Sequence, residues 1–205
     1  ARGTTLRDAE RSYTWDAIGR LRTITRGGLS TEYKYDASGH CISRIESGDT
    51  VNYRWNYATT LPSLTAEISK GIEKYTITTP DGMPVMMIDA AGKHVYYHYD
   101  EQGNTTLLTD EAGKVVGSFA YSPFGEILAQ HASVPQGNFL YRGSTGNYTD
   151  KSNNICFMQS RWYDPATGRF LSRDSKVTPH PNESNPYSYA RNNPMLYYDP
   201  MGTDA

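Results

Sequence analysis

The sequence predicts an all-β protein built from short antiparallel hairpins. A Tyr-x-Tyr-Asp-x-x-Gly pattern recurs along the chain, for example at Tyr33 to Gly39 and Tyr97 to Gly103. The chain has 17 Tyr but only 5 Phe, with 18 Gly and 11 Pro. Tyr favours half-buried strands, and Gly and Pro favour turns. We find no convincing helical periodicity, apart from a turn or two of helix expected near Leu64 to Lys70.

The repeated turn signal gives the organisation of the chain. The step from Asp16 to Asp36 is 20 residues. The Asp-x-x-Gly pattern occurs at Asp16–Gly19, Asp36–Gly39, Asp89–Gly92, Asp100–Gly103 and Asp110–Gly113. Ser122–Gly125 is a variant with Ser in place of Asp, and Asp164–Gly168 has one extra residue.

Each repeat is predicted to form one hairpin. Asp opens the turn by accepting from backbone amides ahead of it, and Gly closes it at positive φ. After Gly19, alternation predicts Leu21 and Thr23 on one face, and Arg22 and Ile24 on the other. A lone hairpin is marginal in water, so the units must pair side by side into a continuous sheet. Loops or irregular strands are expected where the period breaks, at residues 58–69 and 130–138.

Composition limits the function classes. With 205 residues, 37% of them hydrophobic, the chain can form one sizeable domain or two small ones. A net charge of −2 gives no electrostatic reason to expect binding of nucleic acid or an anionic membrane. No apolar run reaches the roughly 18 residues of a membrane span. The N-terminus has neither Met nor a signal-peptide pattern, which indicates a piece of a longer chain.

Cysteine and histidine spacing predicts no metal and no cofactor. Cys41 and Cys156 lie in dissimilar surroundings and are expected to be unpaired thiols. The five histidines show no ligand spacing, and no Ser-His-Asp pattern with a nucleophile elbow is present.

The repeats resemble YD repeats, also called Rhs repeats, and the resemblance covers essentially the whole chain. The segment from Tyr141 to Gly202 resembles the Rhs repeat-associated core domain. Its ordered string reads Tyr141-Arg-Gly, Arg161-Trp-Tyr-Asp-Pro-x-x-Gly-Arg-Phe-Leu-Ser172, Asn185-Pro-Tyr-x-Tyr189 and Asn192-Asn-Pro194. The family includes polymorphic toxins, the C component of insecticidal Tc complexes, wall-associated proteins and teneurins.

The resemblance implies a spiralling hollow β-shell, the Rhs cocoon, that encloses a C-terminal toxin domain. It divides the chain into a YD-repeat shell segment, 1–140, and a core or plug domain, 141–205. It also implies a secreted or delivered effector. The implied partners are the protein's own toxin domain, the upstream shell, secretion or delivery proteins and an immunity protein.

The end of the chain matches a motif that such toxins use for self-cleavage. Pro194, Asp199, Pro200 and Gly202 fit the pattern PxxxxDPxG. In toxin members this motif marks the border to the toxin, and an intramolecular aspartyl protease cuts there. The resemblance makes Asp199 one catalytic acid and Asp174 the upstream one, with Glu183 a weaker candidate.

Two carboxylates suit amide hydrolysis because one can activate water while the other polarises the carbonyl. A pair that shares one proton does both, and it titrates as a unit. An intramolecular substrate also gains proximity without a binding step. Arg191 is a supporting candidate, since an arginine can orient a carboxylate through paired hydrogen bonds.

Each candidate has a plainer interpretation. Asp199 also suits a simple Asp-Pro-x-Gly turn, Asp174 a surface acid or strand-end cap, and Arg191 a solvated rim charge. The family places Leu or another large apolar residue before the cut, whereas this chain has Thr203. A small polar side chain would fill an apolar subsite poorly, which would slow or abolish cleavage.

Two functions therefore remain open. One is the end of a toxin-enclosing shell with a self-cleaving aspartate pair. The other is a structural or adhesive YD-repeat module without cleavage. The bacterial-style core string and the PxxxxDPxG match favour the first. An enzyme acting on outside substrates has little in its favour.

Overall fold

A computed structural model describes residues 3–133, 137–175 and 185–203, which form two antiparallel sheets. The larger sheet, here called the wall, has its strands in chain order. They are β1 (Arg11–Trp15), β2 (Leu21–Arg26), β3 (Leu29–Tyr35), β4 (Cys41–Glu46), β5 (Asp49–Asn56), β6 (Ser63–Ser69), β7 (Ile72–Thr78), β8 (Pro84–Ile88), β9 (His94–Tyr99), β10 (Thr105–Thr109), β11 (Val115–Tyr121) and β12 (Ile127–Ala132).

The smaller sheet and the segment that follows it to residue 203 are here called the plug. Its strands are β13 (Tyr148–Asp150), β14 (Ile155–Met158), β15 (Arg161–Asp164) and β16 (Arg169–Phe170). The described residues contain no α-helix, but they include two 3-10 turns, η1 (Gly143–Thr145) and η3 (Ala190–Asn192). The all-β prediction is confirmed.

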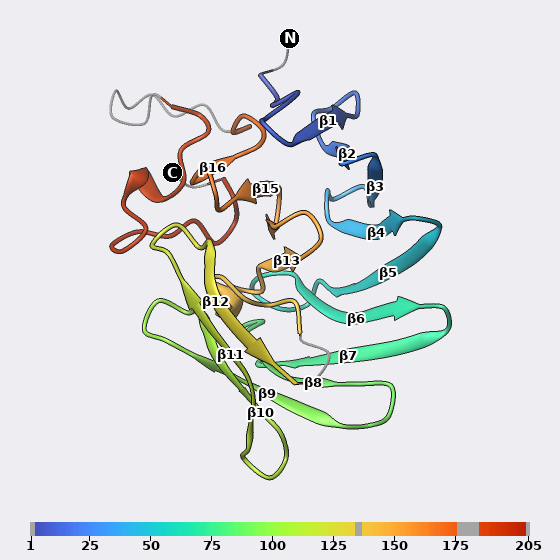
Figure 1. Cartoon of the computed structure of the whole chain (residues 1–205), viewed down its shortest axis with the longest axis vertical. Coiled ribbons are helices and arrows are strands. Elements are labelled where there is room, and N and C mark those ends of the chain that lie inside the picture. The colour runs from blue at the N-terminus through green and yellow to red at the C-terminus, as the bar shows by residue number, and fades with distance from the viewer. Residues whose placement is uncertain (1–2, 134–136, 176–184, 204–205) are drawn as a thin grey trace.

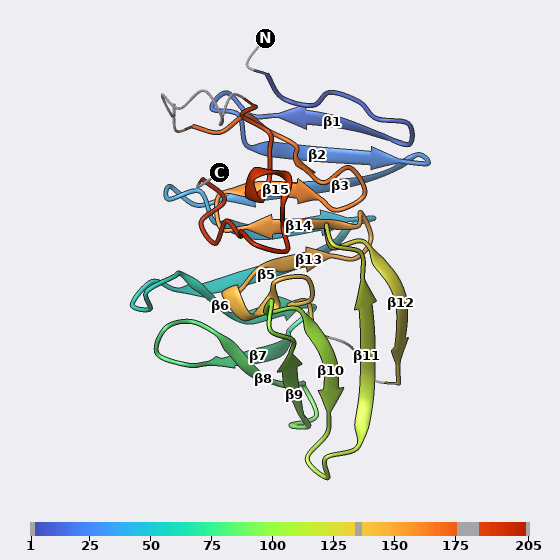
Figure 2. The ribbon, with the colours of Figure 1, turned by 90° about the vertical axis from the view of Figure 1, so that its left-hand side faces the viewer.

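The wall curves around the plug. Figure 1 shows the wall strands in an arc, with the plug strands on its inner side. Figure 2 shows that β1 and β2 run across the view while β11 and β12 stand almost upright. The steady twist between neighbouring strands accumulates into this rotation. The wall thus forms a curved shell segment that holds the plug.

The predicted Asp-x-x-Gly turns are confirmed. In the first, Gly19 N donates to Asp16 O at 3.1 Å, and Asp16 Oδ1 accepts from the amides of Ile18 and Arg20. Gly19 has φ +90°, which an L side chain would adopt only with strain. Backbone bonds close the turns at Asp36 and Asp100 in the same way.

The predicted faces of β2 are wrong. Leu21 and Ile24 were expected on opposite faces, but both are buried, at 1% and 0% exposure. The reason is a β-bulge: Trp15 pairs with Leu21 and Thr14 with Thr23, so Arg22 is an extra residue. A bulge shifts the alternation by one position and increases the local bend. Similar shifts occur at the β3–β4, β5–β6, β7–β8, β9–β10, β10–β11 and β11–β12 pairings.

In four hairpins, an aromatic residue at the end of the first strand donates a hydrogen bond to the start of a bulged strand. Tyr35 Oη donates to the carbonyl of Leu21, the first residue of the preceding bulged strand, at 2.7 Å. Tyr99 does the same for Pro84 at 2.6 Å, and Tyr121 for Thr105 at 2.7 Å. Trp55 donates through its indole nitrogen to Cys41 O at 2.8 Å. These four hairpins are thereby bonded to the hairpin before them.

The helical turn expected at Leu64 to Lys70 is wrong. Residues 63–69 form β6, which pairs with β5 on one side and β7 on the other. Leu64 and Ala66 are both buried, and Leu64 belongs to the core. Hydrogen bonding to two neighbouring strands outweighs a weak local preference for helix, so the segment becomes a strand. Of the two stretches expected to be irregular, residues 130–132 also belong to a strand, β12.

Wall and plug share one core. The rings of Tyr33 and Trp162 lie 4.6 Å apart, and the hydroxyls of Tyr53 and Tyr148 are 2.7 Å apart. Ion pairs also cross this boundary. Arg11 binds Asp164 at 2.7 Å, and Arg44 binds Asp150 at 2.8 Å. Cys41 and Cys156 are buried free thiols, as predicted.

Candidate active site

The Asp-Pro-x-Gly segment does form a turn. Gly202 N approaches Asp199 O at 3.4 Å, and Gly202 has φ +66°. The Asp199 side chain is also engaged, because its Oδ1 accepts from Thr203 N at 3.0 Å. Asp199 is 1% exposed, which is unusual for a simple surface turn. The second oxygen of its carboxylate therefore needs a buried partner.

Arg161 is that partner, and it also binds the other predicted acid. Its Nη2 lies 2.9 Å from Asp174 Oδ2 and 3.4 Å from Asp199 Oδ2. The side chains of Arg161 and Asp199 are buried, with 5% and 0% of their surface exposed, and that of Asp174 is nearly so, at 9%. Because both carboxylate oxygens lie this close to the same nitrogen, the two carboxylates are neighbours. The structure thus brings together two carboxylates that lie 25 positions apart in sequence.

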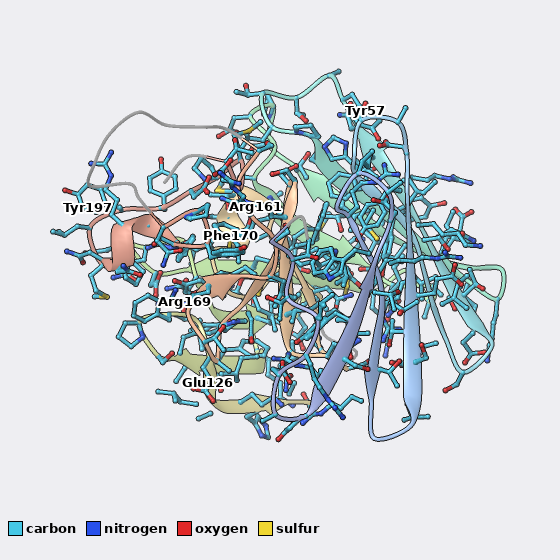
Figure 3. All side chains as sticks on the ribbon, turned by 90° about the horizontal axis from the view of Figure 1, so that it is seen from above. Tyr57, Glu126, Arg161, Arg169, Phe170 and Tyr197 are labelled. Carbon is cyan, nitrogen blue, oxygen red and sulfur yellow. The ribbon has the colours of Figure 1, made fainter. Side chains whose placement is uncertain are left out.

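Arg161 is held by three further contacts. Its Nε donates to the carbonyl of Gly202, and its Nη1 donates to the carbonyl of Pro186 at 3.1 Å. The guanidinium carbon lies 3.6 Å from the centre of the Phe170 ring. Figure 3 shows Arg161 and Phe170 next to each other. Burial lowers the pKa of Arg161 from its usual value, although the charges of Asp174 and Asp199 act in the opposite direction.

The backbone fixes Asp174 on the other side of the site. Asp174 follows β16, and its amide donates to Pro186 O at 3.0 Å. That same carbonyl accepts from Arg161. The strand that carries Arg161, β15, pairs with both β14 and β16. Three chain segments therefore meet at one arginine.

This arrangement can support acid–base chemistry on the chain itself. Gly202 O, bonded to Arg161, lies one residue before the Thr203 carbonyl, and the Thr203 amide is bonded to Asp199. A cavity of about 800 Å³ lies elsewhere, between β12 and the plug, and neither aspartate lines it. The backbone of Gly202 and Thr203, in the chain's own C-terminal segment, contacts Arg161 and Asp199.

The other candidate residues lie as follows. Arg191 is exposed, and its guanidinium lies 5.3 Å from the centre of the Tyr197 ring. Figure 3 shows Tyr197 at the rim, apart from Arg161. Pro194 is buried, and its carbonyl accepts from Arg142. Pro200 and Thr203 are half-buried. Glu183 lies outside the described residues.

Arg161 was missed as a site residue by the sequence reasoning. The sequence carried no signal of its burial, which the structure shows: Arg161 opens a four-residue strand, Arg161–Asp164, in which every residue is buried. A buried arginine needs carboxylates or carbonyls around it. Once that burial is known, acidic partners are expected nearby.

The described residues contain neither a metal-ligand cluster nor a membrane-spanning helix. No group of three or more His, Cys, Asp or Glu side chains in residues 3–133, 137–175 and 185–203 is arranged to hold a metal ion. Among those residues no helix is long and apolar enough to cross a membrane.

The curved wall of bulged Asp-x-x-Gly hairpins, closed by a plug, defines a YD-shell protein. A family model described as Teneurin YD-shell matches residues 1–195, so this chain belongs to that family.

The similar proteins are large. The tRNA3(Ser)-specific nuclease WapA of Bacillus spizizenii is 28% identical over 98% of this chain, which spans 9% of that protein. The double-stranded DNA deaminase toxin A of Burkholderia cenocepacia is 26% identical over 93% of this chain, which spans 15% of it. This chain therefore spans only a small part of its curated relatives.

A solved structure shows the same fold. The crystal structure of TcdB2-TccC3-Cdc42 contains a chain that matches 98% of this one with a TM-score of 0.71 and 19% identity. This chain covers 10% of it.

Proposed function

We propose that this chain is the closing part of an Rhs-type toxin shell and that it carries an autoprotease separating shell from toxin. In this proposal residues 1–140 form the shell segment and residues 141–205 form the core domain. The observation that carries the proposal is the placement of Asp174 and Asp199 on one buried guanidinium that also binds Gly202 O.

The two carboxylates are placed to act as a pair. Amide hydrolysis needs a base to activate water and an acid to support the carbonyl oxygen, and in this proposal a pair of aspartates that shares one proton supplies both.

The reaction proceeds in two proton transfers. One carboxylate takes a proton from water, whose oxygen adds to the carbonyl carbon of Thr203. The other, protonated carboxylate supports the carbonyl oxygen as charge develops on it. The carbon–nitrogen bond of the tetrahedral intermediate then breaks, and the nitrogen of residue 204 leaves as an amine that takes the proton which the first carboxylate received from water. Arg161 orients both carboxylates and holds the Gly202 carbonyl, so the reacting bond stays in place.

The relatives support a proposal about partners and localisation. Proteins named as toxins and nucleases share this segment, and each is far longer than this chain. We propose that the upstream shell and a C-terminal toxin domain complete this protein as well. The whole is then a secreted or delivered effector, with delivery proteins and an immunity protein as further partners.

The alternative is a structural YD-shell module without cleavage. Thr203 favours it, since the family's large apolar residue is missing before the cut. In that case the ion pairs of Arg161 only lock the end of the chain to β15.

Asparagine substitutions in the complete protein, with whatever its gene encodes on either side, test the proposal. Asp174→Asn and Asp199→Asn should each stop cleavage, read as intact mass, without changing the circular dichroism of the shell. Asp110→Asn is the matched control, because Asp110 forms an Asp-x-x-Gly turn far from the pair. Continued cleavage in either site variant would exclude the aspartyl mechanism.

A further inference from the structure

The turn between β14 and β15 forms a seat for the C-terminal segment. Met158 pairs with Arg161, and the two residues between them make a tight turn in which Gln159 has φ +56°. A Cβ on Gly202 would lie 2.2 Å from Met158 O and 3.0 Å from Ser160 Oγ. Only glycine allows the backbone to approach this turn so closely.

Ser160 contacts the seated backbone directly. Its hydroxyl lies 2.7 Å from Met201 O and 3.1 Å from Gly202 O, so one hydrogen can be shared between two successive carbonyls. The Ser160 side chain is at the surface and contributes nothing to the core. Its contacts are to the two residues that precede Thr203.

The seat is itself anchored to the wall. Gln159 is 4% exposed and donates through Nε2 to Pro62 O at 3.0 Å. Pro62 lies in the loop before β6. The turn that carries Ser160 is therefore fixed relative to the wall, and Ser160 next to it presents its hydroxyl from a rigid support.

We propose that Ser160 is a positioning residue for the self-cleavage reaction. The inference rests on the proposed function and extends it. The Arg161 guanidinium donates a hydrogen bond to the Gly202 carbonyl. The Ser160 hydroxyl, in the β14–β15 turn, donates to the carbonyls of Met201 and Gly202. These contacts at two successive carbonyls fix the direction in which the chain leaves Gly202, and the proposal requires this direction to bring the Thr203 carbonyl to the aspartates. Reaction rates respond steeply to such placement.

Two substitutions separate this role from a structural one. In the complete protein, Ser160→Ala should slow cleavage by about fivefold, the rate equivalent of one neutral hydrogen bond. Ser160→Thr keeps the hydroxyl and should cleave at close to the wild-type rate. The thermal midpoint should not change in either variant, because the side chain is exposed. If wild type is cut too slowly to measure, the series is run with Thr203→Leu in every variant.

Ser152→Ala is the matched control. Ser152 lies in the β13–β14 turn at the other end of the same sheet, where it bonds to Arg44 and Glu46. That variant should cleave like wild type. An unchanged rate in Ser160→Ala, an equal loss in Ser160→Thr, or a fall in thermal midpoint that parallels the rate would each overturn the inference. Absence of cleavage even with Thr203→Leu would instead overturn the proposed function, and this inference with it.

Discussion

Arg161 is the residue on which the candidate site depends. Its guanidinium makes four polar contacts, with Asp174, Asp199, Gly202 and Pro186. Lysine keeps the charge but has a single nitrogen, so it cannot span these partners. We expect Arg161→Lys to lose the equivalent of one charged hydrogen bond, about 2 kcal/mol, or about thirtyfold in cleavage rate.

Cleavage rates from intact mass over time check this expectation. Arg169→Lys is the control, since Arg169 is exposed and lies on the neighbouring strand β16 (Figure 3). Equal rates for Arg161→Lys and wild type would show that Arg161 only neutralises charge.

Gly202 gives a second prediction at this scale. Gly202→Ala would adopt φ +66° at a cost of about 1–2 kcal/mol, and its Cβ would clash with Met158 O. We expect the segment to leave its seat and cleavage to fall at least tenfold, a loss of about 1.4 kcal/mol or more. Gly113→Ala carries the same backbone strain, at φ +76°, with no atom within 4 Å of the new Cβ. Full cleavage activity in Gly202→Ala would show that cleavage does not require this close packing of the C-terminal segment against the β14–β15 turn.

The residue scale also shows the limits of sequence reasoning about the site. Asp174 and Asp199 were nominated from motif order, and the structure brings them together. Arg161 could not be selected in the same way, because its burial depends on how β14, β15 and β16 pair. Whether the two aspartates and Arg191 serve catalysis stays a prediction.

Among the elements, the bulged hairpin is the unit that builds the wall. Its turn chemistry is local, so Asp-x-x-Gly could be read directly from the sequence. The bulge is not local: it depends on the register between two strands, and so the faces of Leu21 and Ile24 were mispredicted. The strand at residues 63–69 was missed for a similar reason, since its two partners decide its conformation.

Removing one aromatic hydroxyl tests the bond between successive hairpins. Tyr99→Phe leaves the Pro84 carbonyl without the donor it has at 2.6 Å. We expect the free energy of unfolding to fall by about 1–3 kcal/mol, the cost of an unsatisfied buried acceptor. Tyr96→Phe is the control, because Tyr96 lies on the same strand with its side chain exposed. Denaturant unfolding should separate the two variants, and equal stabilities would refute the role of this bond.

At the scale of the whole molecule, buried tyrosines connect wall and plug. Burial raises the pKa of Tyr33, Tyr53 and Tyr148 well above the usual value near 10. Each folded-state pKa exceeds its unfolded value, so the stability these groups contribute is complete below pH 10. It is lost as the pH rises further, because only the unfolded chain releases the protons.

We therefore expect cooperative unfolding in alkali rather than gradual titration. Tyrosinate absorbance and circular dichroism should change together above about pH 10. If most tyrosines ionise near pH 10 while the sheet signal stays unchanged, the buried aromatic core described here is wrong.

The central claim is that the aspartate pair cuts this chain after residue 203. The most direct measurement is the intact mass of the complete wild-type protein and of its Thr203→Leu variant. We predict an N-terminal product whose mass places its last residue at position 203. Leu should speed the cut about tenfold, since it buries more apolar surface than Thr, worth about 1–2 kcal/mol. A wild type that stays whole while Thr203→Leu is cut would mark a disabled autoprotease. If both proteins keep their full mass, or are cut at another bond, the claim is contradicted and Asp199-Pro200-Met201-Gly202 is only a turn.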